Sequence, residues 1–101
     1  MIHAVKTAPC YFEDAVSGKK PFEVRKNDRD YRERDYIALN EYDANMSETG
    51  YTGRSALFQI TSILDNPEYC KEGYAVLGIK QFCIAENISD CSIIYGQARK
   101  F

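Results

Sequence analysis

The sequence predicts an α+β domain in which one N-terminal helix packs against a small, twisted, partly closed β-barrel of about five mostly antiparallel strands. One segment near the N-terminus has apolar residues at helical spacing, and several later segments alternate between apolar and polar residues. Polar loops rich in glycine, proline or asparagine separate these segments. A chain of 101 residues has the length of one domain, and strands of this number and length are typical of small barrels.

The first predicted strand covers residues 1–6, and the helix follows at about residues 9–17. Pro9 suits the first turn of a helix, where its missing N–H leaves no bond unmade. The apolar side chains that recur at helical spacing are Tyr11, Phe12, Ala15 and Val16. We expect this face, Tyr11 and Phe12 included, to pack into the core. Gly18 can adopt the left-handed conformation that ends a helix, and Pro21 cannot continue one.

The segment at residues 22–26 alternates between apolar and charged side chains, which is typical of a strand. Phe22 and Val24 are expected to face the core, while Glu23 and Arg25 share the opposite face. The polar and charged residues that follow are expected to form a loop.

Three longer strands are expected at residues 36–42, 51–64 and 74–82. The alternation in the first of them predicts a strand that is buried on one face. In the second, Gly53 is expected to mark a bulge. The apolar residues expected to share one face of that second strand are Ala56, Phe58, Ile60 and Leu64.

Residues 1–83 are assigned to this domain, and residues 84–101 to a C-terminal extension packed on the same domain. A short helix, an added strand and a docked tail all fit the extension. Several apolar side chains in it need cover, so a homodimer formed through this tail is one expectation. These side chains are Ile88, Cys91, Ile93, Ile94 and Tyr95.

The charge distribution limits the partners. A net charge of −2 with a pI near 5.4 is not the composition of a general polyanion-binding protein. Residues 18–34, however, hold seven lysines and arginines against four acids, and a local basic surface can steer a phosphate-bearing ligand to one place. The alternative is a self-neutralising solvated face, on which Glu23 and Arg25 form a surface pair worth about 0–1 kcal/mol.

Composition also bears on location and cofactors. The chain has no run of about 18 apolar residues that would span a membrane, and its N-terminus lacks the apolar core of a signal peptide, so a cytoplasmic location is expected. Its one histidine, His3, is expected to be an ordinary strand residue. No two cysteines have Cys-x-x-Cys spacing, so we expect free thiols and no zinc site, and no other cofactor is implied. The cysteines are Cys10, Cys70, Cys83 and Cys91.

Four short segments carry a resemblance to a known family. They are Gly-Lys-Lys-x-x-Glu-x-Arg at residues 18–25, Asn-Asp-Arg-Asp at 27–30, Glu-Tyr-Asp at 41–43 and Tyr-Thr-Gly-Arg at 51–54. In this order and at these spacings they resemble the ASCH superfamily, and within it the small bacterial and phage domains called DUF3850. The resemblance spans about residues 1–82 and implies a PUA-like fold and RNA binding.

The resemblance also draws attention to the turn before Asp35. Sequences of the DUF3850 type place a glycine before the aspartate that matches Asp35, whereas this chain has Arg34. If the turn requires a positive φ, Arg34 is strained by about 1 kcal/mol or more.

We therefore expect a charged cleft that binds RNA or a nucleotide-like ligand. Glu23 would accept hydrogen bonds from a base or hold Arg25 in place, and single-stranded or looped RNA is favoured because its bases are exposed. The expected phosphate ligands are Lys19, Lys20, Arg25 and Arg54. The tyrosines expected to stack a base are Tyr36, Tyr31 or Tyr42.

Two other functions stay open. Some small bacterial ASCH proteins are similar to amidohydrolases that deacetylate N4-acetylcytidine with a Lys-Thr-Glu constellation. Here Lys20 and Arg25 match that pattern, but Glu23 stands at the threonine position, so an enzyme would use Lys20 and Glu23 as its catalytic residues, with Glu23 as general base. A protein-interaction module, served by exposed aromatic residues and the apolar tail, is the third alternative.

Overall fold

Five strands and one helix make up the part of the chain that the computed structural model describes, which is residues 1–46 and 48–85. The elements are β1 (Ile2–Thr7), α1 (Pro9–Val16), β2 (Phe22–Lys26), β3 (Tyr36–Tyr42), β4 (Tyr51–Leu64) and β5 (Tyr74–Ala85). The strands form one sheet in the order β1-β3-β4-β5-β2. β1 pairs with β3 in parallel, and the other pairs are antiparallel. The predicted α+β class with mostly antiparallel strands is confirmed.

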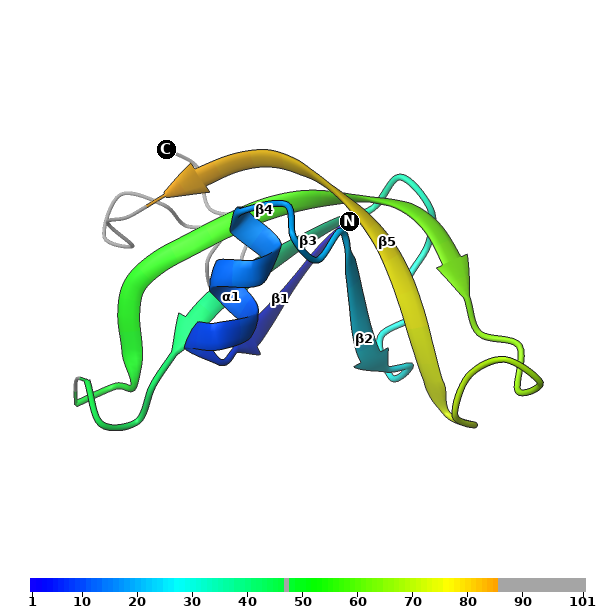
Figure 1. Ribbon diagram of the computed structural model, residues 1–101, viewed down its shortest axis with the longest axis horizontal. Coiled ribbons are helices and arrows are strands. Elements are labelled where there is room, and N and C mark those ends of the chain that lie inside the picture. The colour runs from blue at the N-terminus through cyan, green and yellow to red at the C-terminus, as the bar shows by residue number, and fades with distance from the viewer. Residues whose placement is uncertain (47, 86–101) are drawn as a thin grey trace.

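The sheet curls into a half-barrel with α1 on its concave side (Figure 1). The long strands β4 and β5 form the arch, and the shorter strands β1 and β2 lie at its two edges. Side chains from α1 and the strands meet beneath the arch in one hydrophobic core. Its largest fully buried members are Phe12, Ile37, Leu39, Phe58, Ile60 and Leu77.

The helix has the predicted beginning and ends near the predicted residue. Pro9 occupies its first turn, and Gly18, just beyond the end, has a φ of 82°, as its role in ending the helix requires. Phe12 and Ala15 are buried, but Tyr11 is 56% exposed. The expectation that Tyr11 packs into the core is wrong, because a helix of eight residues turns only a narrow stripe toward the sheet.

The orientation predicted for β2 is also wrong. Phe22 and Val24 are 41% and 51% exposed, whereas Glu23 is 2% exposed. Alternation predicts that successive side chains point to opposite faces, but it does not decide which face is inside. Here the inner face is the one with the charged residues, because Glu23 finds ion-pair partners there.

The middle of the sheet departs from simple alternation. β3 is buried on both faces from Ile37 to Glu41, so the prediction of a half-buried strand is wrong. On the face of β3 opposite Ile37 and Leu39, the Asn40 amide oxygen accepts a hydrogen bond from the Ser55 hydroxyl (2.8 Å). This bond allows the polar Asn40 side chain to be buried.

The pairing of β4 with its neighbours is irregular at three places, and two of them bear on the predictions. The first, opposite the end of β3, includes Gly53 with a φ of 98°, as predicted for a bulge. The second shifts the β4–β5 register between Ile60 and Ser62. It reverses the faces beyond that point, so Ile63 packs against the core while Leu64 is exposed. The expectation that Leu64 shares a face with Ile60 is wrong for this reason.

The strained turn that the resemblance raised is present. Arg34 has a φ of 75°, and its backbone N–H donates to the Ile60 carbonyl (2.8 Å), which fixes the turn against β4. Asp30, in the same loop, has a φ of 51°. The condition for strain at Arg34 is therefore met.

β5 continues to Ala85, three residues beyond the predicted end. The predictions of a boundary at residue 83, an extension at 84–101 and a homodimer through that extension concern residues that lie almost entirely outside the described part of the chain. In the described part of the chain, the one helix is too short to cross a membrane.

Candidate functional site: the seam between β1 and β2

Side chains join β1 and β2, the two edge strands of the half-barrel. Among the described residues, no ladder of backbone hydrogen bonds pairs these two strands. Arg25 Nη2 donates to the Lys6 carbonyl (2.9 Å) and to Thr7 Oγ1 (3.0 Å). Arg29 Nη1 donates to the Ala4 carbonyl (3.0 Å). Alternate carbonyls of an edge strand point away from the sheet. On β1 these include the Ala4 and Lys6 carbonyls, each of which accepts a hydrogen bond from a guanidinium group. We call this line of contacts the seam.

Three residues of the Gly-Lys-Lys-x-x-Glu-x-Arg segment come together on the inner side of β2. The Lys20 ammonium lies 2.7 Å from Glu23 Oε1, and Arg25 Nε lies 2.7 Å from Glu23 Oε2. The turn after α1 fixes Lys20, because its backbone N–H donates to the Asp14 carbonyl (3.0 Å). The two-residue spacing puts Glu23 and Arg25 on one face of the strand. Each oxygen of the buried carboxylate therefore has a cationic donor.

A hollow of about 550 Å³ opens over this cluster, and we call it the Glu23 pocket. The end of β1, the start of α1 and β2 form its walls. The Tyr11 ring, whose centroid is 5.5 Å from Lys20 Nζ, stands beside it as an exposed aromatic surface. The lining residues are Lys6, Thr7, Ala8, Tyr11, Lys20, Glu23, Val24 and Arg25.

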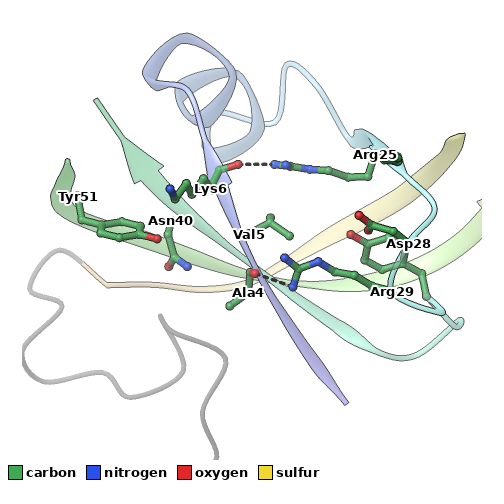
Figure 2. A pocket seen from close by; sticks show the side chains of 10 residues that line it. Ala4, Val5, Lys6, Arg25, Asp28, Arg29, Asn40 and Tyr51 are labelled. Atoms are coloured by element: carbon green, nitrogen blue, oxygen red, sulfur yellow. Dashed lines mark hydrogen bonds between the residues drawn. The ribbon is translucent and has the colours of Figure 1, made fainter. Parts of the chain in front are cut away.

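A second hollow, of about 390 Å³, shares Lys6 and Arg25 with the first, and we call it the Arg29 pocket. Figure 2 shows Arg25 and Arg29 reaching across it toward the backbone of β1, with Tyr51 and Asn40 at the other end. The loop after β2 supplies Asp28, Arg29 and Tyr31 to its wall.

The two pockets differ in the balance of their charges. The Glu23 pocket has one acid, Glu23, against three cations, and two of these, Lys20 and Arg25, form ion pairs with that acid. The Arg29 pocket has one acid, Asp28, against four cations: Lys6, Arg25, Lys26 and Arg29. None of the ion pairs between described residues includes Lys6, Lys26 or Arg29. The Lys6 ammonium lies instead 4.3 Å from the Tyr42 ring centroid. All three of these cations line the Arg29 pocket, and only Lys6 also lines the Glu23 pocket, so the positive charge without an ion-pair partner among the described residues is concentrated in the Arg29 pocket.

A buried polar group supports the wall of the Arg29 pocket. The His3 ring packs 4.7 Å from the Tyr31 ring, and His3 Nε2 lies 2.8 Å from Asp35 Oδ2. Burial raises the pKa of Tyr31, although the positive charges of Arg29 and Arg25 oppose this. His3 is a residue of strand β1, as expected, and its ring links the pocket wall to Asp35.

Asp35 is held as an anion at the far end of this group. Burial alone would raise its pKa, but hydrogen bonds from His3 and from the N-terminal ammonium, together with their charges, outweigh burial and hold the pKa of Asp35 below its ordinary value. The N-terminal ammonium lies 3.2 Å from Asp35 Oδ1.

The remaining expected site residues lie elsewhere. Lys19 is exposed in the turn after α1 and lines neither pocket. Arg54 pairs with Glu13 and, at 3.7 Å, with Glu41. Tyr36 contacts Phe82 edge-to-face, with ring centroids 5.4 Å apart, and pairs with Ile2 at the opposite end of β1. Five residues of strand, roughly 16 Å, separate Ile2 from the pocket residue Thr7.

Sequence reasoning missed Lys6, Lys26 and Arg29 as site residues. The signal available for Lys26 and Arg29 was their place in the basic segment at residues 18–34, but acids lie two to four residues from each of them, so spacing alone does not set them apart. Lys6 gave no such signal, because its place in the site follows from the parallel pairing of β1 with β3.

Comparison with known proteins gives two findings. The family model described as "Domain of unknown function (DUF3850)" matches residues 2–79. The chain is also similar to the "Uncharacterized 12.9 kDa protein in GpA 3'region" of Escherichia phage P2, with 36% identity over 76 residues. The match covers 75% of this chain and 65% of that phage protein. All of the seam residues named above lie inside the family match.

Proposed function

We propose that this chain, which belongs to the DUF3850 family, binds RNA or a nucleotide-like ligand in the seam between β1 and β2. The observation that carries the proposal is the convergence of Lys20, Glu23 and Arg25 on a hollow of about 550 Å³. Ligand pockets commonly measure about 300–1,000 Å³, with a few polar groups that fix the ligand's orientation.

The residues of the Glu23 pocket suit distinct parts of such a ligand. A carboxylate has about four acceptor positions, so Glu23 can accept from a base amino group while it keeps Lys20 and Arg25. The exposed Tyr11 ring offers a surface for stacking a base, worth about 1–3 kcal/mol. Lys20 supplies a compact positive charge beside that ring.

We further propose that the family belongs to the ASCH superfamily with a PUA-like fold, and that the protein is cytoplasmic. A half-barrel of mostly antiparallel strands with one helix supports the first proposal. Free thiols at Cys10 and Cys70 agree with the second, because a reducing compartment keeps cysteines in this state.

The test is a fluorescence titration with short labelled RNAs at two salt concentrations. We expect saturable binding that weakens as salt rises, and weaker binding in Lys20→Gln and Arg25→Gln variants than in a Lys71→Gln control. Lys71 lies against Tyr74, outside both pockets. Absence of saturable binding to RNAs and to nucleotides at low salt would rule the proposal out.

An amidohydrolase acting on a modified nucleoside is the second candidate, and one observation favours it. The Thr7 hydroxyl lines the same pocket as Lys20 and Glu23 and accepts a hydrogen bond from Arg25. A hydroxyl is thus available although Glu23 stands where the resemblance places a threonine. Incubation with N4-acetylcytidine tests this candidate. If product still forms in a Glu23→Gln variant, Glu23 is not the base. If the wild type forms no product, it does not have this activity on this substrate.

A further inference from the structure

We infer that the Arg29 pocket is a phosphate-binding site, so that the ligand of the seam carries a phosphate group and is a nucleotide or an RNA strand and not a free nucleoside. This inference rests on the proposed function and deepens it, because it assigns the two pockets to different parts of one ligand. The first observation is the charge of the Arg29 pocket, with four cations and one carboxylate among its described lining residues.

The second observation is the way in which these cations are partnered. Lys20 and Arg25 share the Glu23 carboxylate, and Arg54 lies between Glu13 and Glu41. Lys6, Lys26 and Arg29, in contrast, enter no ion pair with another described residue. A doubly charged phosphate would meet cations that no carboxylate of the described residues pairs with, and such charges favour anion binding.

The third observation is the geometry of Arg29. One of its five N–H donors is used on the Ala4 carbonyl (3.0 Å), and this bond holds the guanidinium beside β1. Figure 2 shows Arg29 and Arg25 entering the pocket from the same side, with Lys6 toward its other end. A planar guanidinium held in this way can donate two parallel hydrogen bonds to a phosphate.

The two pockets share Lys6 and Arg25, so one ligand can occupy both. A base in the Glu23 pocket would lie against Tyr11 and Glu23, and the attached phosphate would lie on the far side of Arg25. Because Lys20 and Arg25 are already paired with Glu23, the phosphate is expected to contribute most of the salt-dependent part of the affinity.

Calorimetry with the four common ribonucleosides, their 5′-monophosphates and a short ribo-oligomer tests the inference. The test variant is the double mutant Lys26→Gln/Arg29→Gln, and the matched control is Lys71→Gln/Lys80→Gln, which changes the net charge equally outside both pockets. A second variant, Lys26→Gln alone, keeps the Arg29 bond to β1 in case the first one disturbs the seam, and it leaves the lining of the Glu23 pocket unchanged.

The wild type is expected to bind a monophosphate at least about tenfold more tightly than the nucleoside, a difference of about 1.4 kcal/mol, because the phosphate accepts charge-assisted hydrogen bonds from the pocket. The double mutant should lose that difference and Lys26→Gln should reduce it. Both should keep the nucleoside affinity, while the control keeps the difference and the nucleoside affinity. An oligomer that binds more tightly than a monophosphate, with a salt slope reduced in the variants, identifies RNA as the source of the phosphate. Equal affinities for the oligomer and the monophosphate identify a mononucleotide as the source of the phosphate.

Three results would overturn the inference. The first is equal binding of nucleosides and monophosphates by the wild type, which leaves the proposed function intact. The second is an equal loss of affinity in the Lys71→Gln/Lys80→Gln control, which would reduce the effect to net charge. The third is no binding of any of these probes, which defeats the proposed function as well.

Discussion

The Glu23 pocket and the Arg29 pocket share Arg25, but they differ in how their charged side chains are paired. In the Glu23 pocket a buried carboxylate is matched by Lys20 and Arg25 at 2.7 Å each. In the Arg29 pocket three cations converge without a carboxylate in ion-pair reach among the described residues. The cations of the recognisable motif, Lys20 and Arg25, are therefore the ones already paired with a carboxylate. The charge that is available to an outside anion lies next to them.

The largest expected effect comes from removing the acid that balances the Glu23 pocket. Glu23→Gln leaves Lys20 and Arg25 partly buried without their anion, so the free energy of unfolding should fall by about 2–3 kcal/mol, below the range for fully buried pairs because both cations are partly exposed. Urea denaturation measures this loss. The exposed Glu33→Gln serves as the control and should change stability by less than about 0.5 kcal/mol. Equal losses of stability in Glu23→Gln and Glu33→Gln would contradict the claim that Glu23 balances the buried cations of its pocket.

The second prediction compares the two arginines of the seam. Arg25 donates to Glu23, to the Lys6 carbonyl and to Thr7, whereas Arg29 has one described hydrogen bond, to Ala4. Lysine cannot reproduce a fork of donors, so Arg25→Lys should cost about 1–2 kcal/mol of stability. Arg29→Lys should cost less than half as much. Denaturation of the two variants side by side gives the ranking, and the reverse ranking would show that Arg25 does not hold the seam.

The third prediction concerns the support of the Arg29 pocket. The folded-state pKa of Asp35 lies below its unfolded value, so the ionised carboxylate adds stability above about pH 3.9. That contribution is lost as the pH falls through the folded-state pKa. Stability curves of the wild type and Asp35→Asn, measured by denaturation from neutral to acidic pH, should therefore differ near neutrality and converge below about pH 3.9. A constant difference across that range would show that Asp35 is not the group responsible.

The smallest expected effect, and the one stabilising change, is in the loop that carries Arg29. Arg34 has a φ of 75°, which costs a residue with a side chain about 1–2 kcal/mol and costs glycine nothing. Glycine gains entropy in the unfolded chain, so Arg34→Gly should raise stability by about 0.5–1 kcal/mol. Glu33→Gly, at a position without positive φ, should lower it. If Arg34→Gly leaves ligand affinity unchanged, the strain is separate from the site.

Local geometry could be predicted from the sequence where a residue type has few conformational options. Pro9, Gly18 and Gly53 each occupy the expected place, and Arg34 meets the condition of positive φ that the resemblance raised. The spacing of Lys20, Glu23 and Arg25 also predicted that these side chains lie together.

Tertiary context decided the rest. The pattern of β2 could not show that its charged face is the inner one, because burying Glu23 depends on Lys20 arriving from the turn. The register shift beyond Ile60, which exposes Leu64, has no signal in the alternation. The assignment of Arg54 to the cleft relied on the order of the motifs, and that of Tyr36 on its expected nearness to the cleft as a base-stacking residue. The parallel pairing of β1 with β3, in contrast, brought Lys6 to the seam.

Amide chemical-shift mapping of the isotopically labelled protein during titration with a short single-stranded RNA tests the central claim most directly. If the seam is the ligand site, the largest shifts gather on both edge strands and the loop between β2 and β3, at Lys6, Thr7, Glu23, Arg25 and Arg29. Shifts that gather instead on the β4–β5 turn around Tyr69, or that spread over the surface without saturating, would contradict it.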